Sequence, residues 1–421
     1  MKNIAVFRDN KYSKGADRRP RGESLFKQEK ELLHVRKRFY SFYFLFFFGY
    51  GAFYPLLSVY LKDAVHLSGG QIGLILSISP VVMIFIQPVW GIMSDLTRKP
   101  TVLLTIALLL TALFAFLFSL FKSYEWLLLA MIFLAAFQSA IVPLSDSIAV
   151  SFSEKSKIPY GSIRLWGALG FAAAVFVMGR LAEIFHLSVI FYTFTLFLIA
   201  SALFAHRLPK ENKAMKVDLK SGIKELFKIK KYLIFLLAAF LMMGPTLAHN
   251  IYFGIYINEI GGTLAGVGIA FLVAAGSEAP FMKAANRLIQ RFGIERVLLF
   301  AVLISSLRWL FYYIMPSLPF VYATCIVQGF SIGLFIPAAL QYVRKLAPGH
   351  LGATAISLYT AVGNGFGNWF CTFAGGLIYE RYSALSVYLF FDVLSSLSFL
   401  LFVMINTFSK KTAAVQSSVS S

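Results

Sequence analysis

The amino-acid sequence predicts an all-α integral membrane protein with 12 transmembrane helices in two pseudo-symmetric six-helix bundles and with both termini in the cytoplasm. Three observations lead to this prediction: the composition, the number of long apolar segments, and the distribution of Lys and Arg. Of the 421 residues, 58% are hydrophobic and 14% are charged, and the mean hydropathy is +0.74. Soluble domains are about 45–50% apolar and about 25% charged, which excludes an ordinary soluble or a disordered chain.

The apolar segments have the length that a membrane-spanning helix needs, about 20 residues. The first of them is too long and begins too late in the chain to be a signal peptide. The connections are short, so we expect no large soluble domain. In chain order, the predicted spans lie at residues 39–61, 70–92, 101–121, 126–150, 160–182, 187–206, 232–257, 264–285, 297–315, 319–343, 353–378 and 385–407.

Lys and Arg are distributed unequally between the two sides of the membrane that these spans define. Of the 39 basic residues, 32 fall on the side of the two termini and 4 on the other side. Because basic loops stay in the cytoplasm, both termini are predicted to be cytoplasmic. The net charge of +20 is therefore a topology signal, and it favours anionic lipid over nucleic acid as a partner.

An internal repeat divides the predicted spans into two halves. A shift of 195 residues places Gly73 on Gly268, and places Val102, Leu103 and Leu104 on Val297, Leu298 and Leu299 without a gap. Parallel repeats of this kind enclose a binding site between two bundles that rock about it. The predicted parts are a basic tail (1–38), a first bundle (39–206), a central cytoplasmic loop (207–231), a second bundle (232–408) and a second tail (409–421).

The loop predicted after the second span carries a recognisable motif. It reads Gly91-Ile-Met-Ser-Asp95-Leu-Thr-Arg98-Lys99. Together with the two bundles and the basic central loop, it resembles the major facilitator superfamily, whose motif has Gly, three residues, Asp, then Arg, any residue, Gly and basic residues. Leu96 stands where Arg is usual, and Arg98 stands where Gly is usual. The resemblance implies that Gly91, Asp95, Arg98 and Lys99 act in gating; a solvated loop is the alternative.

Two further segments indicate a branch of that superfamily. The first span contains Phe44-Leu-Phe-Phe-Phe-Gly-Tyr-Gly-Ala-Phe-Tyr-Pro55, and the fifth begins Tyr160-Gly-Ser-Ile-Arg164-Leu-Trp166. These strings are similar to the lactose permease family of oligosaccharide/proton symporters and to the phenylpropionate-permease-like group. The resemblance implies a proton-driven transporter and leaves its solute open.

Charged residues inside spans are costly and usually mark a pair or a polar pathway. Asp146 in the fourth span and Arg164 in the fifth lie at matching depths, so we expect them to pair. The lactose permease family holds sugar with an acid and an arginine on these helices, which implies solute binding; a structural pair is the alternative. Trp166, near Arg164, is a candidate aromatic face for a sugar.

Glu278 in the eighth span and Arg308 in the ninth form a second acidic and basic set, which we expect several residues inside the cytoplasmic ends. Burial favours the neutral form of a carboxyl group, and a nearby arginine favours its charged form. If gating moves the arginine, the affinity of the acid for a proton changes with the gate. Glu278 and Arg308, with Asp146, are therefore candidates for proton coupling. Asp392 in the last span has no assignable partner.

Several uncharged polar residues also fall inside spans. His249 and Asn250 are candidate binding residues, although a lone buried histidine is more often a packing residue. Asn364 and Asn368 are four residues apart and share a helix face, but the glycines beside them also suit close helix packing. Gln328 is a further candidate for a polar surface.

The tenth span departs from the lactose permease family, which has a His and a Glu there for proton coupling. This span reads Val327-Gln328-Gly-Phe-Ser331-Ile-Gly-Leu-Phe-Ile-Pro337 and has neither residue. A coupled proton must therefore use Glu278 or Asp146, or coupling is absent. The departure also weakens the case for lactose-like sugars.

The sequence has no Walker loop, no metal-ligand spacing and no nucleophile–base motif, so we expect no enzyme, no metal and no cofactor. The favoured function is proton-coupled symport of a small polar solute, with a sugar or oligosaccharide ahead of an aromatic acid or a nucleoside. A membrane enzyme and a non-transporting sensor are remote alternatives. We expect a monomer in the plasma membrane of a bacterium, with the solute, protons and lipid as its partners.

Overall fold

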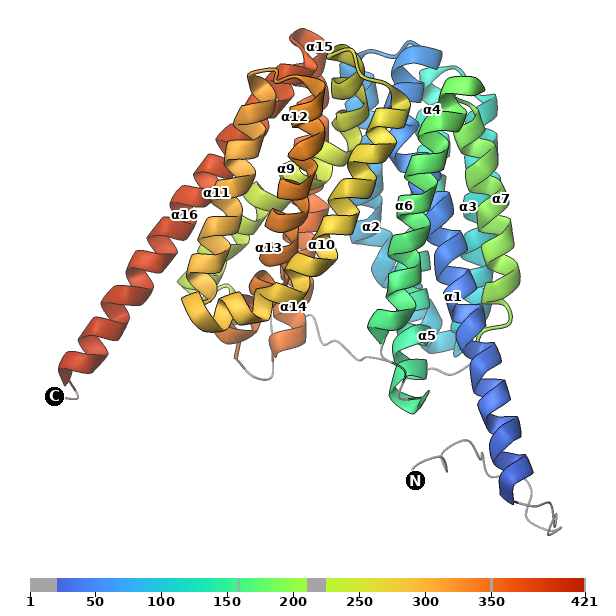
Figure 1. The fold of residues 1–421 in the computed structure, drawn as a ribbon, viewed down its shortest axis with the longest axis horizontal. Helices are drawn as coiled ribbons and strands as arrows, with labels where there is room; N and C mark the ends of the chain where they lie inside the picture. Colours follow the sequence, from blue (N-terminus) through green and yellow to red (C-terminus); the bar gives the residue numbers. More distant parts are fainter. Residues whose placement is uncertain (1–20, 157, 159, 210–224, 349–350, 420–421) are drawn as a thin grey trace.

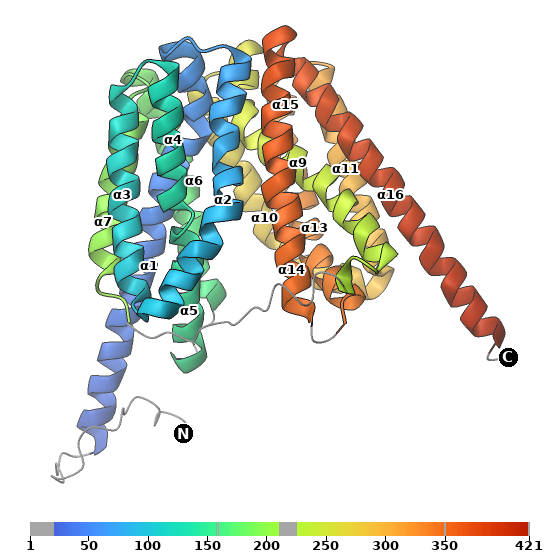
Figure 2. The same cartoon turned by 180° about the vertical axis from the view of Figure 1, so that it is seen from behind.

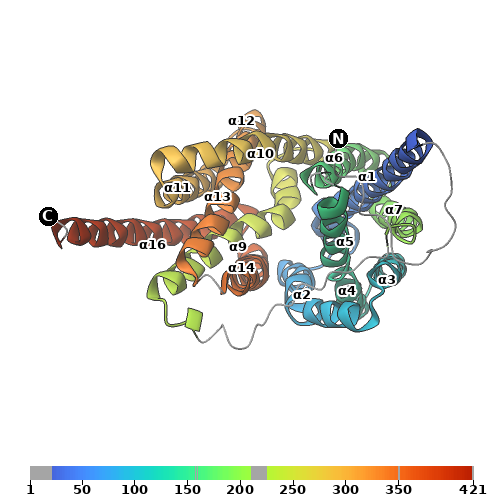
Figure 3. The same cartoon turned by 90° about the horizontal axis from the view of Figure 1, so that it is seen from below.

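The computed structural model describes residues 21–156, 158, 160–209, 225–348 and 351–419, and the side chains of these residues except 21–29, 95, 154, 353 and 408–419. Every regular element in these ranges is helical. The helices form two groups that stand side by side, with α1–α7 on the right and α9–α16 on the left of Figure 1. The view from below also shows the two groups next to each other (Figure 3).

The first group begins with the longest helix of the chain, which continues into a short π-helix. The helix starts before the predicted span at 39–61, because the charged segment ahead of the apolar run is also helical. The elements of this group are α1 (Arg21–Val59), η1 (Tyr60–Ala64), α2 (Gly69–Thr97), α3 (Pro100–Leu120), α4 (Tyr124–Gln138), α5 (Ile141–Ser156), α6 (Tyr160–Ile184) and α7 (Val189–Ala205).

The second group also consists mainly of long helices. It ends with a helix that extends past the predicted last span, to Val419. The elements are α9 (Lys230–Glu259), α10 (Leu264–Phe292), α11 (Ile294–Tyr313), α12 (Leu318–Ala323), α13 (Cys325–Leu346), α14 (Gly352–Thr360), η3 (Ala361–Gly367), α15 (Asn368–Arg381) and α16 (Ala384–Val419).

Three of the predicted spans are interrupted in the structure. The fourth is split into α4 and α5 near Ser139, because Pro143 has no N–H to donate to the carbonyl group four residues earlier. The tenth is split into α12 and α13 at Thr324. The eleventh contains the π-helix η3 between α14 and α15, and π-turns inside helices are frequent at functional sites.

Within the described residues, nine helical segments are long and apolar enough to cross a membrane. Two of the segments each join two consecutive helices, α4 with α5 and α12 with α13. The segments lie at Lys30–Ala64, Gly69–Ser94, Pro100–Leu120, Tyr124–Ser153, Tyr160–Ile184, Lys230–Glu259, Leu264–Phe292, Leu318–Leu346 and Ala384–Thr407. The chain is therefore a multi-pass membrane protein.

The two groups meet at one end and diverge toward the other (Figure 1, Figure 2). We call the end where they meet the distal end; it lies opposite the end where α1 begins and α16 ends. A hydrophobic cluster of the second group includes Val59 and Val175 from the first. Lys62 forms an ion pair with Glu259 at 3.4 Å, and Ser58 donates a hydrogen bond to the carbonyl group of Ile251. The distal contact is thus both apolar and polar.

Candidate functional site

The first group contains an acidic and a basic side chain in contact. Asp146 on α5 and Arg164 on α6 are 3.6 Å apart between Oδ1 and Nη1, and their side chains are 30% and 39% exposed. The hydroxyl group of Tyr43 on α1 donates to Oδ1 of Asp146 at 2.6 Å. The short connection between α5 and α6 brings the two charges to the same depth, so the predicted pairing is confirmed. We call these three residues the first polar site.

The guanidinium group of Arg164 also lies over an aromatic ring. Its Cζ is 4.3 Å from the centre of the Phe47 ring, a distance at which a cation is attracted by the face of the ring. Trp166 is two residues further along α6 and stacks on Tyr40, with ring centres 5.4 Å apart. Positions two apart do not face each other on a helix, and Trp166 and Arg164 accordingly contact different rings of α1.

The second group contains a buried arginine with neutral neighbours. Arg308 on α11 is 4% exposed, and its Nη1 donates to Oε1 of Gln328 on α13 at 2.9 Å. Its Cζ lies 4.1 Å from the centre of the Trp309 ring. Nε and Nη2 of Arg308 have no hydrogen-bond partner in the described part of the chain. A buried cation with two unused donors is a site for an acceptor group of a ligand or for ordered water.

His249 on α9 belongs to the same buried region. It is 1% exposed, and its Nδ1 is 3.0 Å from the hydroxyl group of Tyr388 on α16. Its ring lies 4.9 Å from that of Trp309. We call Arg308, Gln328, Trp309, His249 and Tyr388 the second polar site. The histidine is thus hydrogen-bonded within an aromatic cluster next to an arginine.

Glu278 on α10 does not pair with Arg308. No ion pair joins Glu278 to any residue that the structure describes. Both residues are 15 positions from Gly293, so at 1.5 Å per residue each lies about 22 Å from that turn. Both residues therefore lie several turns inside their helices. Gly329 packs on the backbone of α10 at Glu278, since a Cβ there would lie 2.8 Å from its amide nitrogen, and this contact places α13 against that part of α10.

The three predicted asparagines occupy different environments. Oδ1 of Asn250 is buried and has no partner in the described ranges. Oδ1 of Asn368 accepts a hydrogen bond from Thr372 at 3.1 Å. Asn364 lies in the π-helix η3 and is exposed. Of the three, Asn250 therefore has the clearest unused hydrogen-bonding capacity.

The predicted gating segment is mostly helical. α2 continues to Thr97, so Gly91 and Asp95 lie inside a helix and not in a loop, while Arg98 and Lys99 form the turn. The side chain of Asp95 lies outside the described residues. Arg98 caps the helix in the left-handed conformation, with φ of 53°. Glycine adopts this conformation most easily, which gives a physical reason why the motif usually has Gly there.

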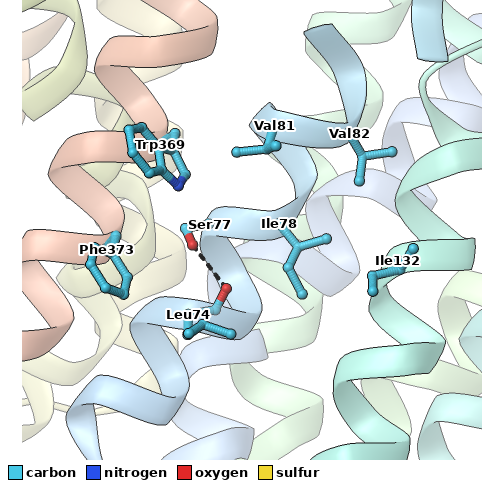
Figure 4. Close-up of a pocket in the computed structure, with 8 residues that line it drawn as sticks. All are labelled: Leu74, Ser77, Ile78, Val81, Val82, Ile132, Trp369 and Phe373. Carbon is cyan, nitrogen blue, oxygen red and sulfur yellow. Dashed lines mark hydrogen bonds between the residues drawn. The ribbon is translucent and has the colours of Figure 1, made fainter. Parts of the chain in front are cut away.

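A cavity of about 460 Å³ lies between α2, α4 and α15. Figure 4 shows that apolar side chains surround it, and the hydroxyl group of Ser77 donates to the carbonyl group of Leu74 on its own helix. None of the predicted site residues lines this cavity. Its lining is mostly apolar. Its lining residues are Leu74, Ser77, Ile78, Val81, Val82, Ile132, Trp369 and Phe373.

Three members of the two polar sites, Tyr43, Trp309 and Tyr388, were not predicted from the sequence. Tyr43 is hidden in an aromatic run, and Trp309 and Tyr388 look like ordinary aromatic packing residues. Asp392, which had no assignable partner, accepts a hydrogen bond from Ser306 at 2.6 Å. No set of three His, Cys, Asp or Glu side chains in the described residues could hold a metal ion.

Comparisons with known proteins agree with this architecture. The model of the MFS_1 like family matches residues 37–390. A protein of Geobacillus stearothermophilus named "Maltose permease" is 52% identical over 84% of this chain and 90% of its own. The "Probable 3-phenylpropionic acid transporter" of Escherichia coli is 28% identical over 80% of this chain and 89% of its own. The crystal structure of the nucleoside transporter NupG (D323A mutant) superposes with a TM-score of 0.81 at 20% identity, covering 88% of this chain and 99% of that one.

The helical architecture and these matches define the class of the protein: it is a multi-pass membrane transporter of the major facilitator type. Its relatives are permeases and transporters, not enzymes. Within that class, the chain belongs to the MFS_1 like family.

Proposed function

We propose that the protein is a proton-coupled symporter of a sugar or oligosaccharide, with a maltose-type glucoside as the first candidate. The observation that carries this proposal is the 52% identity to a protein named maltose permease over most of both chains. The first polar site supports it, because a half-exposed carboxylate and guanidinium group beside an aromatic ring can accept and donate hydrogen bonds to sugar hydroxyl groups.

We also propose how the chain is arranged in the membrane. The helices α7, α11 and the rod α14–η3–α15 add to the nine candidate spans, which gives 12 spans in two bundles, 39–206 and 232–408, joined by the central loop. The bias of Lys and Arg places both termini in the cytoplasm, so the distal end faces outward. The protein then works as a monomer by alternating access and needs no cofactor.

Glu278 is the proposed proton carrier. It is a half-buried carboxyl group on a membrane-spanning helix, and no described cation forms an ion pair with it. Such a group gains and loses a proton as its exposure changes. A proton that moves down 100 mV releases about 2.3 kcal/mol, enough for a roughly fiftyfold solute gradient.

The test is uptake of labelled maltose into energised cells or proteoliposomes, together with external pH in weakly buffered, de-energised cells. We expect a transient alkalinisation when maltose is added, and we expect Glu278→Gln to lose accumulation against a gradient but keep downhill exchange. Glu125→Gln, which removes a carboxylate from the first turn of α4, is the matched control. Accumulation that survives Glu278→Gln would show that another group carries the proton.

The second polar site favours one other solute class, an aromatic acid. The unused Nε and Nη2 of Arg308 suit a carboxylate, and the Trp309 ring lies beside them. The 28% identity to a protein named 3-phenylpropionic acid transporter supports this alternative. A panel of disaccharides, aromatic acids and nucleosides in the same two assays separates the classes, because the transported class alone alkalinises the medium.

A further inference from the structure

The helices α2 and α10 begin at the distal end in the same way. A helix leaves its first four N–H groups without a partner inside the helix. The hydroxyl group of Ser68 accepts from the amide of Gln71 at 3.4 Å, and that of Thr263 accepts from the amide of Gly266 at 3.1 Å. Each hydroxyl group therefore binds the amide of the third residue of its helix, and the amide of the second residue remains available.

That second amide is bound by a carboxylate from the other group of helices. The amide of Gly70 on α2 donates to Oε2 of Glu380 on α15 at 2.9 Å. The amide of Ala265 on α10 donates to Oε1 of Glu183 on α6 at 2.8 Å. Helix N-termini carry a partial positive charge, and hydrogen bonds to a carboxylate are stronger than neutral ones. Each group thus caps a helix of the other.

The two caps are related by the internal repeat. The shift of 195 residues that aligns Gly73 with Gly268 also aligns Ser68 with Thr263 and Gly70 with Ala265. Glu183 and Glu380 are each the penultimate residue of their helix, since α6 ends at Ile184 and α15 at Arg381. The same contact is therefore built twice, once in each direction across the interface.

Close backbone packing brings both carboxylates within reach. A Cβ built on Gly73 would lie 2.7 Å from Cα of Gly376 on α15, and one built on Gly268 would lie 2.5 Å from the carbonyl oxygen of Val175 on α6. Side chains at either glycine would separate the helices. Arg180 holds the other oxygen of Glu183 at 3.0 Å, which fixes the carboxylate toward α10.

We propose that Glu183 and Glu380 are positioning residues for transport, which act as a reciprocal pair of caps that hold the distal end closed. The inference rests on the proposed function, because alternating access requires this end to open. Opening separates the two groups and breaks both hydrogen bonds, so the caps stabilise one state alone. A contact made in one state shifts the equilibrium by its own free energy. For an exposed carboxylate at a helix N-terminus, this corresponds to about a two- to fivefold shift for each cap.

The test measures access to the interface. Val175→Cys is a reporter at 2% exposure between α6 and α10, in a background in which the buried Cys325 and Cys371 are replaced by alanine. A membrane-impermeant maleimide is applied from outside, and its labelling rate follows the fraction of open molecules. We expect Glu183→Gln with Glu380→Gln to raise this rate about four- to twenty-fivefold, and each single variant to raise it less.

Further variants separate loss of the caps from misfolding and from a general effect of removing charge. Gly70→Ala leaves Glu380 intact but places a Cβ against its Oε2, so it should displace the carboxylate and accelerate labelling as Glu380→Gln does. The two changes together should have no added effect. Ala265→Pro removes the donor to Glu183 at a helix position that tolerates proline. Glu125→Gln removes a charge from the start of α4 and should leave the rate unchanged.

A labelling rate that stays within twofold of the parent in Glu183→Gln with Glu380→Gln would overturn the proposal, as would equal acceleration by Glu125→Gln. The readout is independent of flux. Faster labelling in a protein that moves no solute would refute the proposed transport function and leave the assignment of the two caps intact.

Discussion

Arg164 in the first group of helices and Arg308 in the second both lie on membrane-spanning helices, but their partners differ. Arg164 has a carboxylate 3.6 Å away, and its side chain is 39% exposed. Arg308 is 4% exposed and is hydrogen-bonded to a neutral amide at 2.9 Å. The first site is charge-balanced and open to solvent, whereas the second is buried and keeps an excess positive charge. Because of this difference, removal of a partner should weaken solute binding in the first site and destabilise the fold in the second.

The largest effect is expected at the second site. Gln328→Leu removes the acceptor of a buried guanidinium group, and a buried charge left without its partner destabilises a protein by about 2–4 kcal/mol. Thermal unfolding of the detergent-solubilised protein checks this. Gln328→Glu keeps an acceptor in the same place and adds a counter-charge, so it should retain the stability of the parent. Equal losses in both variants would mean that the packing of the Gln328 side chain matters and its hydrogen bond does not.

At the first site the expected effect is on affinity. Asp146→Asn removes one charge from the pair and a charged acceptor from the solute, and hydrogen bonds to charged groups contribute about 1.5–3 kcal/mol. Half-saturation of maltose uptake should therefore rise about ten- to hundredfold, while stability changes by less than about 1 kcal/mol, as for other exposed pairs. Asp392→Asn makes the same chemical change on α16, where Ser306 is the partner.

Asp146→Asn and Asp392→Asn together test whether the first polar site has a special role in transport. If Asp392→Asn weakens uptake as much as Asp146→Asn does, then loss of any membrane-embedded acid impairs transport, and the first polar site has no special role. If Asp146→Asn lowers stability and spares uptake, the ion pair is a structural lock between α5 and α6.

The sequence predicted the pairing of Asp146 and Arg164, because both residues lie near one short connection and their depths follow from counting residues. It did not predict that Gln328 binds Arg308 or that His249 contacts Tyr388. Those contacts depend on how each helix is rotated about its axis and on which helices are neighbours, and neither follows from hydropathy. Within α6, Trp166 and Arg164 contact different rings of α1, which also depends on how the helix is rotated.

Helix ends were predicted less well than helix interiors for a related reason. Hydropathy ends where the membrane ends, but backbone hydrogen bonds continue past it, so Gly91 and Asp95 lie in α2 and not in a loop. The caps on α2 and α10 could have been predicted from the sequence, because the repeat that aligns Gly73 with Gly268 also aligns Ser68 with Thr263. Their carboxylate partners could not be found in this way, because Glu183 and Glu380 are distant in sequence from the helices that they cap.

The smallest expected effect is on stability and concerns the turns that follow α2 and α10. The shift of 195 residues aligns Arg98 with Gly293, and both have positive φ, 53° and 87°. A side chain with a Cβ is strained in this region and glycine is not, so Arg98→Gly should stabilise the protein by about 0.5–1 kcal/mol. Gly293→Ala should destabilise it by about 1–2 kcal/mol, as measured by the same thermal unfolding.

Uptake by Arg98→Gly then separates a backbone role from a gating role. If the turn needs only a relaxed backbone, the variant is more stable and transports maltose at the rate of the parent. If the guanidinium group of Arg98 acts in gating, the variant is more stable but slower, and Arg98→Lys, which keeps the charge and the strain, restores the rate without the gain in stability. A variant that is neither more stable nor slower would show that Arg98 adopts its left-handed conformation without backbone strain. The turns at Arg98 and Gly293 would then differ in sequence but not in conformational strain.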